Sequence, residues 1–212
     1  MVKVVKYAKL SLRKETKVGD TKDNASLNWS CRNGFPRITV YTSGNIKRGD
    51  SNELDYSKII IAPFDHITLS SFLNMCEEVL HSDTEIRREV ECYNTKFVNG
   101  SRLDEVYLQA KVIIGRDKLG IYYIAAVEEE KPKVKFELLP STKFFRFVTE
   151  NSEEVSNISR HYANAYIGLL RKCIERDVVD SIVVTEFEEK HKKNTKPTPP
   201  KNDIDITEDI PF

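Results

Sequence analysis

The sequence predicts an α+β fold of two successive β-β-β-β-α units, with antiparallel sheets backed by helices, followed by a disordered C-terminal tail. Three observations predict this fold. Alternating apolar and polar residues indicate strands in two separate stretches of the chain. Each stretch is followed by a run with apolar residues at three- and four-residue spacing, as in an amphipathic helix. After residue 187 the chain becomes rich in Lys, Pro and then acids, a composition that cannot bury a core.

The first unit covers residues 1–82. Its predicted elements are a half-buried strand at 3–14, a hairpin with strands at 26–32 and 37–42, a polar loop at 44–56, a short apolar strand at 58–62 and a helix at 68–81. The core face of the first strand is predicted to carry Val4, Ala8, Leu10 and Leu12. Asn33-Gly34 provides the turn signal of the hairpin. The helix has one apolar stripe, formed by Leu69, Phe72, Leu73, Cys76, Val79 and Leu80.

The second unit covers residues 83–187 and repeats the pattern. Its predicted strands lie at 85–98, 105–115, 121–127 and 133–139, and residues 144–148 extend the last strand or add another. Turn signals separate the strands, for example Asn99-Gly100. Asn151 or Ser152 can cap a long helix that is expected to run to about Arg176. We therefore predict a body at residues 1–187, with possible subrepeats 1–82 and 83–187.

Composition excludes several functional classes. The four cysteines and four histidines are scattered without metal-ligand spacing, and no P-loop, GxGxxG or HExxH motif is present. We therefore expect no enzyme activity, no cofactor and no metal site. The N-terminus lacks the apolar run of a signal peptide, and no stretch approaches 18 apolar residues. A reducing cytoplasm, bacterial or of a phage-infected host, and no membrane partner are expected.

Charge is distributed unevenly, although 33 basic and 33 acidic residues give a net charge of zero. Residues 203–212 contain four acids and no base, so residues 1–202 carry a net charge of +4. The excess comes from five lysines in the linker at 188–202, which is predicted to be disordered. A nucleic-acid-binding face must therefore be a local patch of the body.

The acidic tail, residues 203–212, is the most informative segment. Its docking residues are predicted to be Asp203, Asp205, Glu208, Asp209, Ile210, Pro211 and Phe212. The Phe212 ring can insert into a shallow apolar pocket, its α-carboxylate can meet a basic side chain there, and the acids can lie on a basic ridge. Pro211 lowers the entropy lost on docking. The tail is therefore expected to bind another protein.

The closing residues Glu208-Asp209-Ile210-Pro211-Phe212 resemble the acidic tip of bacterial single-stranded-DNA-binding proteins. Phage single-stranded-DNA-binding proteins often carry a comparable tail. The resemblance implies that the tail recruits replication, repair and recombination proteins and competes weakly with DNA for the protein's own binding face. It covers about ten residues, and Ile204, Ile206 and Thr207 replace part of the usual acidic run.

The body is too large for the plain OB-fold typical of that family, although an elaborated OB-fold is an alternative. The twin β-β-β-β-α units instead resemble the Whirly and Pur-alpha type of single-strand binder. In that type, sheets backed by helices leave their other faces free for the strand. No diagnostic Whirly motif is present, so this resemblance rests on topology alone.

Single-strand binders combine Lys and Arg for phosphates with aromatic rings for stacking bases. Residues of these types on the exposed faces of the predicted strands are the candidate DNA contacts: Lys3, Tyr7, Lys9, Arg13, Arg32, Arg37, Tyr41, Tyr107, Lys111, Lys133 and Lys135. Tyr107 and Lys111 are expected to share one face, as are Lys133 and Lys135. Trp29, Tyr162 and Tyr166 lie on apolar faces and are expected in the core.

The sequence therefore predicts sequence-independent binding of single-stranded DNA during replication and recombination, with partner proteins recruited through the acidic tail. We also expect a homo-oligomer. Two alternatives remain open. The chain is either an interaction protein that engages host replication factors through the tail without binding DNA, or a strand-annealing recombination factor.

Overall fold

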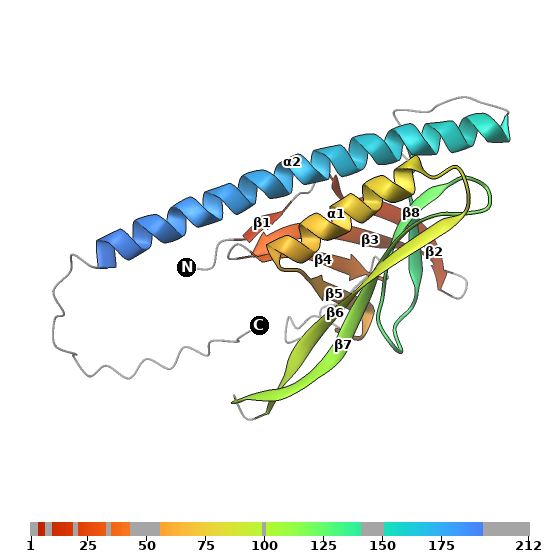
Figure 1. The fold of residues 1–212 in the computed structure, drawn as a ribbon. Helices are drawn as coiled ribbons and strands as arrows, with labels where there is room; N and C mark the ends of the chain where they lie inside the picture. Colours follow the sequence, from red (N-terminus) through yellow and green to blue (C-terminus); the bar gives the residue numbers. More distant parts are fainter. Residues whose placement is uncertain are drawn as a thin grey trace.

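The computed structural model contains two antiparallel sheets and two long helices, which confirms the α+β arrangement of two β-β-β-β-α units (Figure 1). It describes residues 4–6, 10–18, 21–32, 35–42, 56–98, 101–140 and 151–192. The first unit contains β1 (Val4–Lys6), β2 (Leu12–Val18), β3 (Thr21–Arg32), β4 (Phe35–Tyr41), the short 3-10 helix η2 (Tyr56–Lys58), β5 (Ile59–Pro63) and α1 (His66–His81). The second contains β6 (Ile86–Val98), β7 (Ser101–Arg116), β8 (Tyr122–Val127), β9 (Val134–Glu137) and α2 (Ser152–Lys192).

The prediction of a single strand at 3–14 is wrong, because the structure has two separate strands here, β1 and β2. Both segments pair with β3 along the edge opposite β4, β1 near Arg32 and β2 from Leu27 to Thr21. The first sheet therefore has the order β1-β3-β4-β5, with β2 completing the β1 edge. β3 also begins earlier than predicted, since the hairpin of β2 and β3 includes polar residues that show no apolar alternation.

α1 begins at His66 because Asp65 caps it. The Asp65 carboxylate accepts hydrogen bonds from the Thr68 backbone N–H at 2.7 Å and from the Thr68 hydroxyl at 2.8 Å. Such a cap satisfies backbone donors that a first helical turn leaves unpaired. The predicted apolar stripe is confirmed, since all six of its residues, Leu69, Phe72, Leu73, Cys76, Val79 and Leu80, are buried.

The second sheet has the order β6-β7-β8-β9, as expected for successive antiparallel strands. α2 starts within one residue of its predicted cap but continues to Lys192, so residues 188–192 of the predicted linker are helical. The remaining linker, the acidic tail and residues 144–148 lie outside the described residues.

A β-bulge in β7 changes which side chains share a face. Cys92 pairs with Ala110 but Tyr93 pairs with Leu108, so Gln109 is an extra residue. Tyr107 therefore lies on the face opposite Lys111, and the prediction that these two residues share a face is wrong.

One hydrophobic core joins the two units. A continuous cluster of buried residues includes side chains from both sheets and both helices. Within it Trp29 stacks on Phe64 with ring centroids 6.4 Å apart, and the Phe72 ring lies tilted against Phe64 with centroids 5.9 Å apart. The two units therefore fold around a shared interior.

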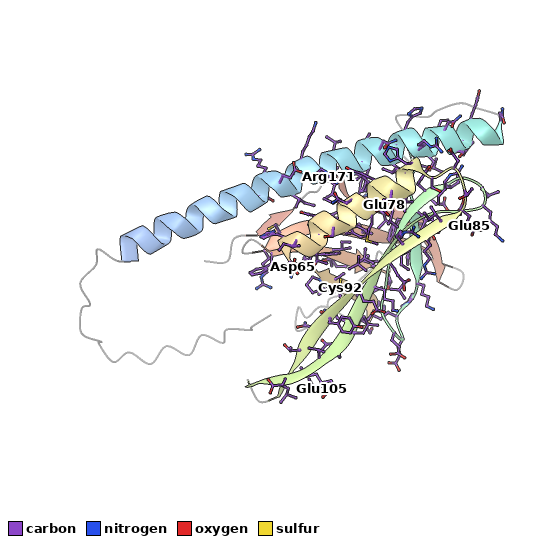
Figure 2. All side chains as sticks on the ribbon, in the orientation of Figure 1. Asp65, Glu78, Glu85, Cys92, Glu105 and Arg171 are labelled. Atoms are coloured by element: carbon purple, nitrogen blue, oxygen red, sulfur yellow. The ribbon has the colours of Figure 1, made fainter. Side chains whose placement is uncertain are left out.

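The two helices lie side by side and run in opposite directions over the sheets (Figure 1). Arg171 of α2, labelled in Figure 2, donates hydrogen bonds to Asn74 at 3.0 Å and to Glu77 at 2.8 Å on α1. Nearer the start of α2, Arg160 contacts Asp83, just after the end of α1. Neither described helix contains an apolar stretch that could cross a lipid bilayer.

Candidate nucleic-acid interface

On β2, β3 and β4, the side of the first sheet turned away from the helices is mainly polar, whereas β5 adds Ile59, Ile61 and Pro63 to it. Cross-strand partners point to the same side of a sheet, so the register places Arg13 with Ser26 and Tyr41, Asn28 with Thr39, Ser30 with Arg37, and Arg32 with Phe35. We call these nine residues the polar face. The intervening residues, such as Leu27, Trp29 and Val40, are buried toward the helices.

Two of the three arginines on the polar face, Arg32 and Arg37, lie close enough for their charges to interact. Arg37 is half-buried and donates from Nε to the Ser30 hydroxyl at 3.3 Å. Burial lowers the pKa of the Arg37 guanidinium, and the nearby positive charge of Arg32 lowers it further. Among the described residues no carboxylate forms an ion pair with Arg37. An anion placed between these arginines would relieve their mutual repulsion.

Small polar groups and aromatic rings occupy the rest of the polar face. Ser11, before β2, donates to the Asn28 side chain at 2.6 Å, and Asn28 donates to the Ser26 hydroxyl at 3.2 Å. Tyr41 is half-buried, whereas Phe35 is 55 % exposed and stacks on His66 with ring centroids 6.5 Å apart. The polar face therefore offers cations, hydrogen-bonding groups and rings without a carboxylate.

Four of the candidate residues predicted from the sequence, Arg13, Arg32, Arg37 and Tyr41, belong to the polar face. Lys3, Tyr7 and Lys9 lie outside the described residues. The sequence interpretation missed Phe35, Asn28 and the small hydroxyl residues. Alternation along β3 would have identified Asn28, but Phe35 was assigned to the turn when it is the first residue of β4.

The candidates from the second unit belong to the part of the chain that forms the other sheet, and two of them, Lys111 and Lys135, have acidic partners. Lys111 forms ion pairs with Glu91 at 2.5 Å and Glu89 at 3.8 Å. Its hydrogen bond with Glu91 raises the pKa of Lys111 and lowers that of Glu91. Local carboxylates already neutralise this surface, which weakens its attraction for phosphate.

Lys135 and Lys133 differ in their surroundings. Lys135 pairs with Asp117 at 2.7 Å and lies 4.8 Å from the centre of the Tyr123 ring. Lys133 is exposed but precedes β9, so only Lys135 is held within the strand. The structure therefore does not bring these lysines together with the polar face of the first sheet.

Comparison of the chain with protein-family models, with curated proteins and with solved structures gives no match.

Proposed function

We propose that this protein binds single-stranded DNA across the polar face of its first sheet, without sequence preference. The observation that carries the proposal is the pair Arg32 and Arg37 beside Tyr41 on the polar face, whose nine residues include no carboxylate. Guanidinium groups can bind successive phosphates, while an aromatic ring can stack on an unpaired base. Ser and Asn side chains can bond to any base edge, which suits binding without sequence readout.

The arrangement of the body supports the same proposal. Two sheets backed by helices resemble the Whirly and Pur-alpha type of single-strand binder more than a five-stranded OB-fold barrel with one helix. In our proposal, the first sheet provides the DNA-binding surface and the acidic tail recruits replication or recombination proteins. The body needs no catalytic group for this role.

Fluorescence anisotropy of a labelled thymidine oligonucleotide tests the proposal. We expect binding at low salt that weakens linearly with the logarithm of salt concentration, because phosphate contacts release counterions. Arg37→Ala should weaken binding and reduce the slope of that plot by about 0.7, the value for one lost phosphate contact on a single strand. Arg87→Ala is the matched control, since Arg87 is exposed and pairs with Glu89 on the second sheet.

An absence of binding at low salt would overturn the proposal and favour an interaction protein that acts through its tail. Equal effects of Arg37→Ala and Arg87→Ala would place the DNA elsewhere on the body. Mixing two complementary labelled strands with the protein also separates coating from annealing, because only an annealing factor accelerates duplex formation.

A further inference from the structure

An open pocket of about 510 Å³ lies where the turn between β7 and β8 meets the first turns of α2. Its walls include apolar side chains from both elements, Leu119 and Ile121 from the turn and Val155 from the helix. Arg116 and Lys118 add positive charge. The pocket is built from different elements than the polar face, so it is a second candidate site.

Hydrogen bonds hold the turn in shape. The Asp117 carboxylate accepts from the backbone N–H groups of Leu119 at 3.0 Å and Ile121 at 2.9 Å. Gly120 has a positive φ of 78°, and its carbonyl accepts from the Ser156 hydroxyl at 3.1 Å. These bonds fix the turn against α2, so the pocket is formed before any ligand arrives.

The charges around the pocket favour an acidic ligand. Arg116 contacts the Asp83 backbone carbonyl and the Ser156 hydroxyl, but its buried Nε has no acceptor among the described residues. Lys118 is exposed and makes no ion pair with a described carboxylate. The carboxylate of Asp83, which also lines the pocket, is bound by Arg160. An apolar pocket lined by two cationic side chains suits a segment that combines acids with apolar residues.

This chain contains such a segment, the acidic tail. It carries four acids, three isoleucines and Phe212, with no basic residue. We propose that the pocket binds the acidic tail of a second copy of the chain, so that copies link tail to body. The inference rests on the docking role assigned to the tail under the proposed function and specifies one partner for it.

The length of α2 favours a second copy over the chain's own tail. From Ser156 at the pocket to Lys192, the helix extends about 54 Å, at about 1.5 Å per residue. A flexible chain as long as residues 193–212 has a root-mean-square span of about 25 Å. It would reach about 70 Å only when fully extended. Docking within one copy would therefore stretch the tail almost completely, whereas a neighbouring copy can present its pocket nearby.

Such contacts join two different surfaces, so each copy can bind one neighbour through its tail and another through its pocket. On a single strand of DNA this arrangement links successive copies and makes binding cooperative. The direct consequence to measure is that copies of the protein associate with each other in the absence of DNA.

Two full-length variants test the link. The pocket variant carries Lys118→Glu and Leu119→Asp, at positions that are exposed, Leu119 by 78 %. The tail variant carries Ile210→Ser and Phe212→Ser. In sedimentation velocity without DNA, the wild-type protein should form larger species as concentration rises, while each variant alone remains monomeric. A mixture of the two should form a one-to-one dimer, because one variant supplies the tail and the other the pocket.

Three results would overturn the inference: a wild-type protein that stays monomeric, a single variant that still associates, or a mixture that stays monomeric. If the pocket variant misfolds, a synthetic peptide of residues 203–212 provides the second test. It should dissociate wild-type assemblies, and a scrambled peptide of the same composition should not. Oligonucleotide binding is measured separately from self-association. Failure of the DNA-binding proposal can therefore be distinguished from failure of the tail-to-pocket contact.

Discussion

Trp29 and Tyr166 connect the first sheet to α2 through a buried hydrogen bond. The Trp29 indole Nε1 donates to the Tyr166 hydroxyl oxygen at 2.9 Å, and the same hydroxyl donates to the Leu10 carbonyl at 2.8 Å. Burial raises the pKa of Tyr166, which keeps the phenol protonated as a donor. One hydroxyl therefore joins β3, Leu10 ahead of β2, and α2.

Replacing this hydroxyl should destabilise the whole body. Tyr166→Phe leaves the Trp29 N–H and the Leu10 carbonyl buried without a partner, which should cost about 1–3 kcal/mol of unfolding free energy. Urea denaturation followed by tryptophan fluorescence measures the loss. Tyr162→Phe is the control, since the Tyr162 hydroxyl forms no hydrogen bond with the described part of the chain, and it should change stability by less than about 0.5 kcal/mol. Equal losses of unfolding free energy in Tyr166→Phe and Tyr162→Phe would contradict a stabilising role of the buried hydrogen bonds.

Two glycines should respond to alanine in opposite directions. Gly120 has φ of 78°, and an added Cβ would collide with Ser156, so Gly120→Ala should destabilise the protein by at least about 1–2 kcal/mol. Gly168 lies within α2, and an added Cβ there meets no atom within 4 Å. Gly168→Ala should therefore stabilise the protein by about 0.5–1 kcal/mol. Thermal melts of both variants check the signs, and a stabilising Gly120→Ala would contradict the turn geometry.

Periodicity predicted the repeated β-β-β-β-α order, because most strands and both helices bury one face in the common core. The helical stripe of α1 and the core positions of Trp29 and Tyr166 follow from that principle. The candidate site was predicted only where alternation continued without interruption, as at Arg32, Arg37 and Tyr41.

Local irregularities account for the wrong predictions. The extra residue Gln109 reverses the alternation of β7, so Tyr107 moves to the other face, and nothing in the sequence marks that bulge. The break between β1 and β2 depends on β3 being long enough to pair with both. The acidic partners of Lys111 lie on β6, a strand away, and spacing within β7 contains no information about them.

Asp83 should make stability depend on pH in the acidic range. A hydrogen bond from Arg160, and then the charges of Arg160 and Arg116, lower the pKa of Asp83 below its usual 3.8. The carboxylate therefore stabilises the folded state above pH 3.8, and this contribution is lost as pH falls through the lower, folded-state pKa. In urea denaturation, the free energy of unfolding of wild type should exceed that of Asp83→Asn by a constant amount from pH 7 to about 5. This difference should shrink below pH 3.8.

Asp104→Asn is the control for this pH dependence, because Asp104 is exposed on β7. The unfolding free energy of Asp104→Asn should stay close to that of wild type over the whole pH range. A difference for Asp83→Asn that persists unchanged to pH 2 would mean that the ion pair with Arg160 does not stabilise the fold.

Tyr41 should contribute to DNA binding through its ring and not through its hydroxyl. Stacking of one base on an aromatic side chain contributes about 1–3 kcal/mol, so Tyr41→Ala should weaken oligonucleotide binding by roughly 5- to 150-fold. Tyr41→Phe keeps the ring and should bind within about twofold of wild type. Tyr93→Ala provides the matched control, because Tyr93 is 54 % exposed on the second sheet, where the neighbouring Lys111 is already neutralised by Glu91. If Tyr41→Phe loses as much affinity as Tyr41→Ala, the hydroxyl is the contact and stacking on the polar face is excluded. If Tyr93→Ala loses more than Tyr41→Ala, the strand instead follows the second sheet.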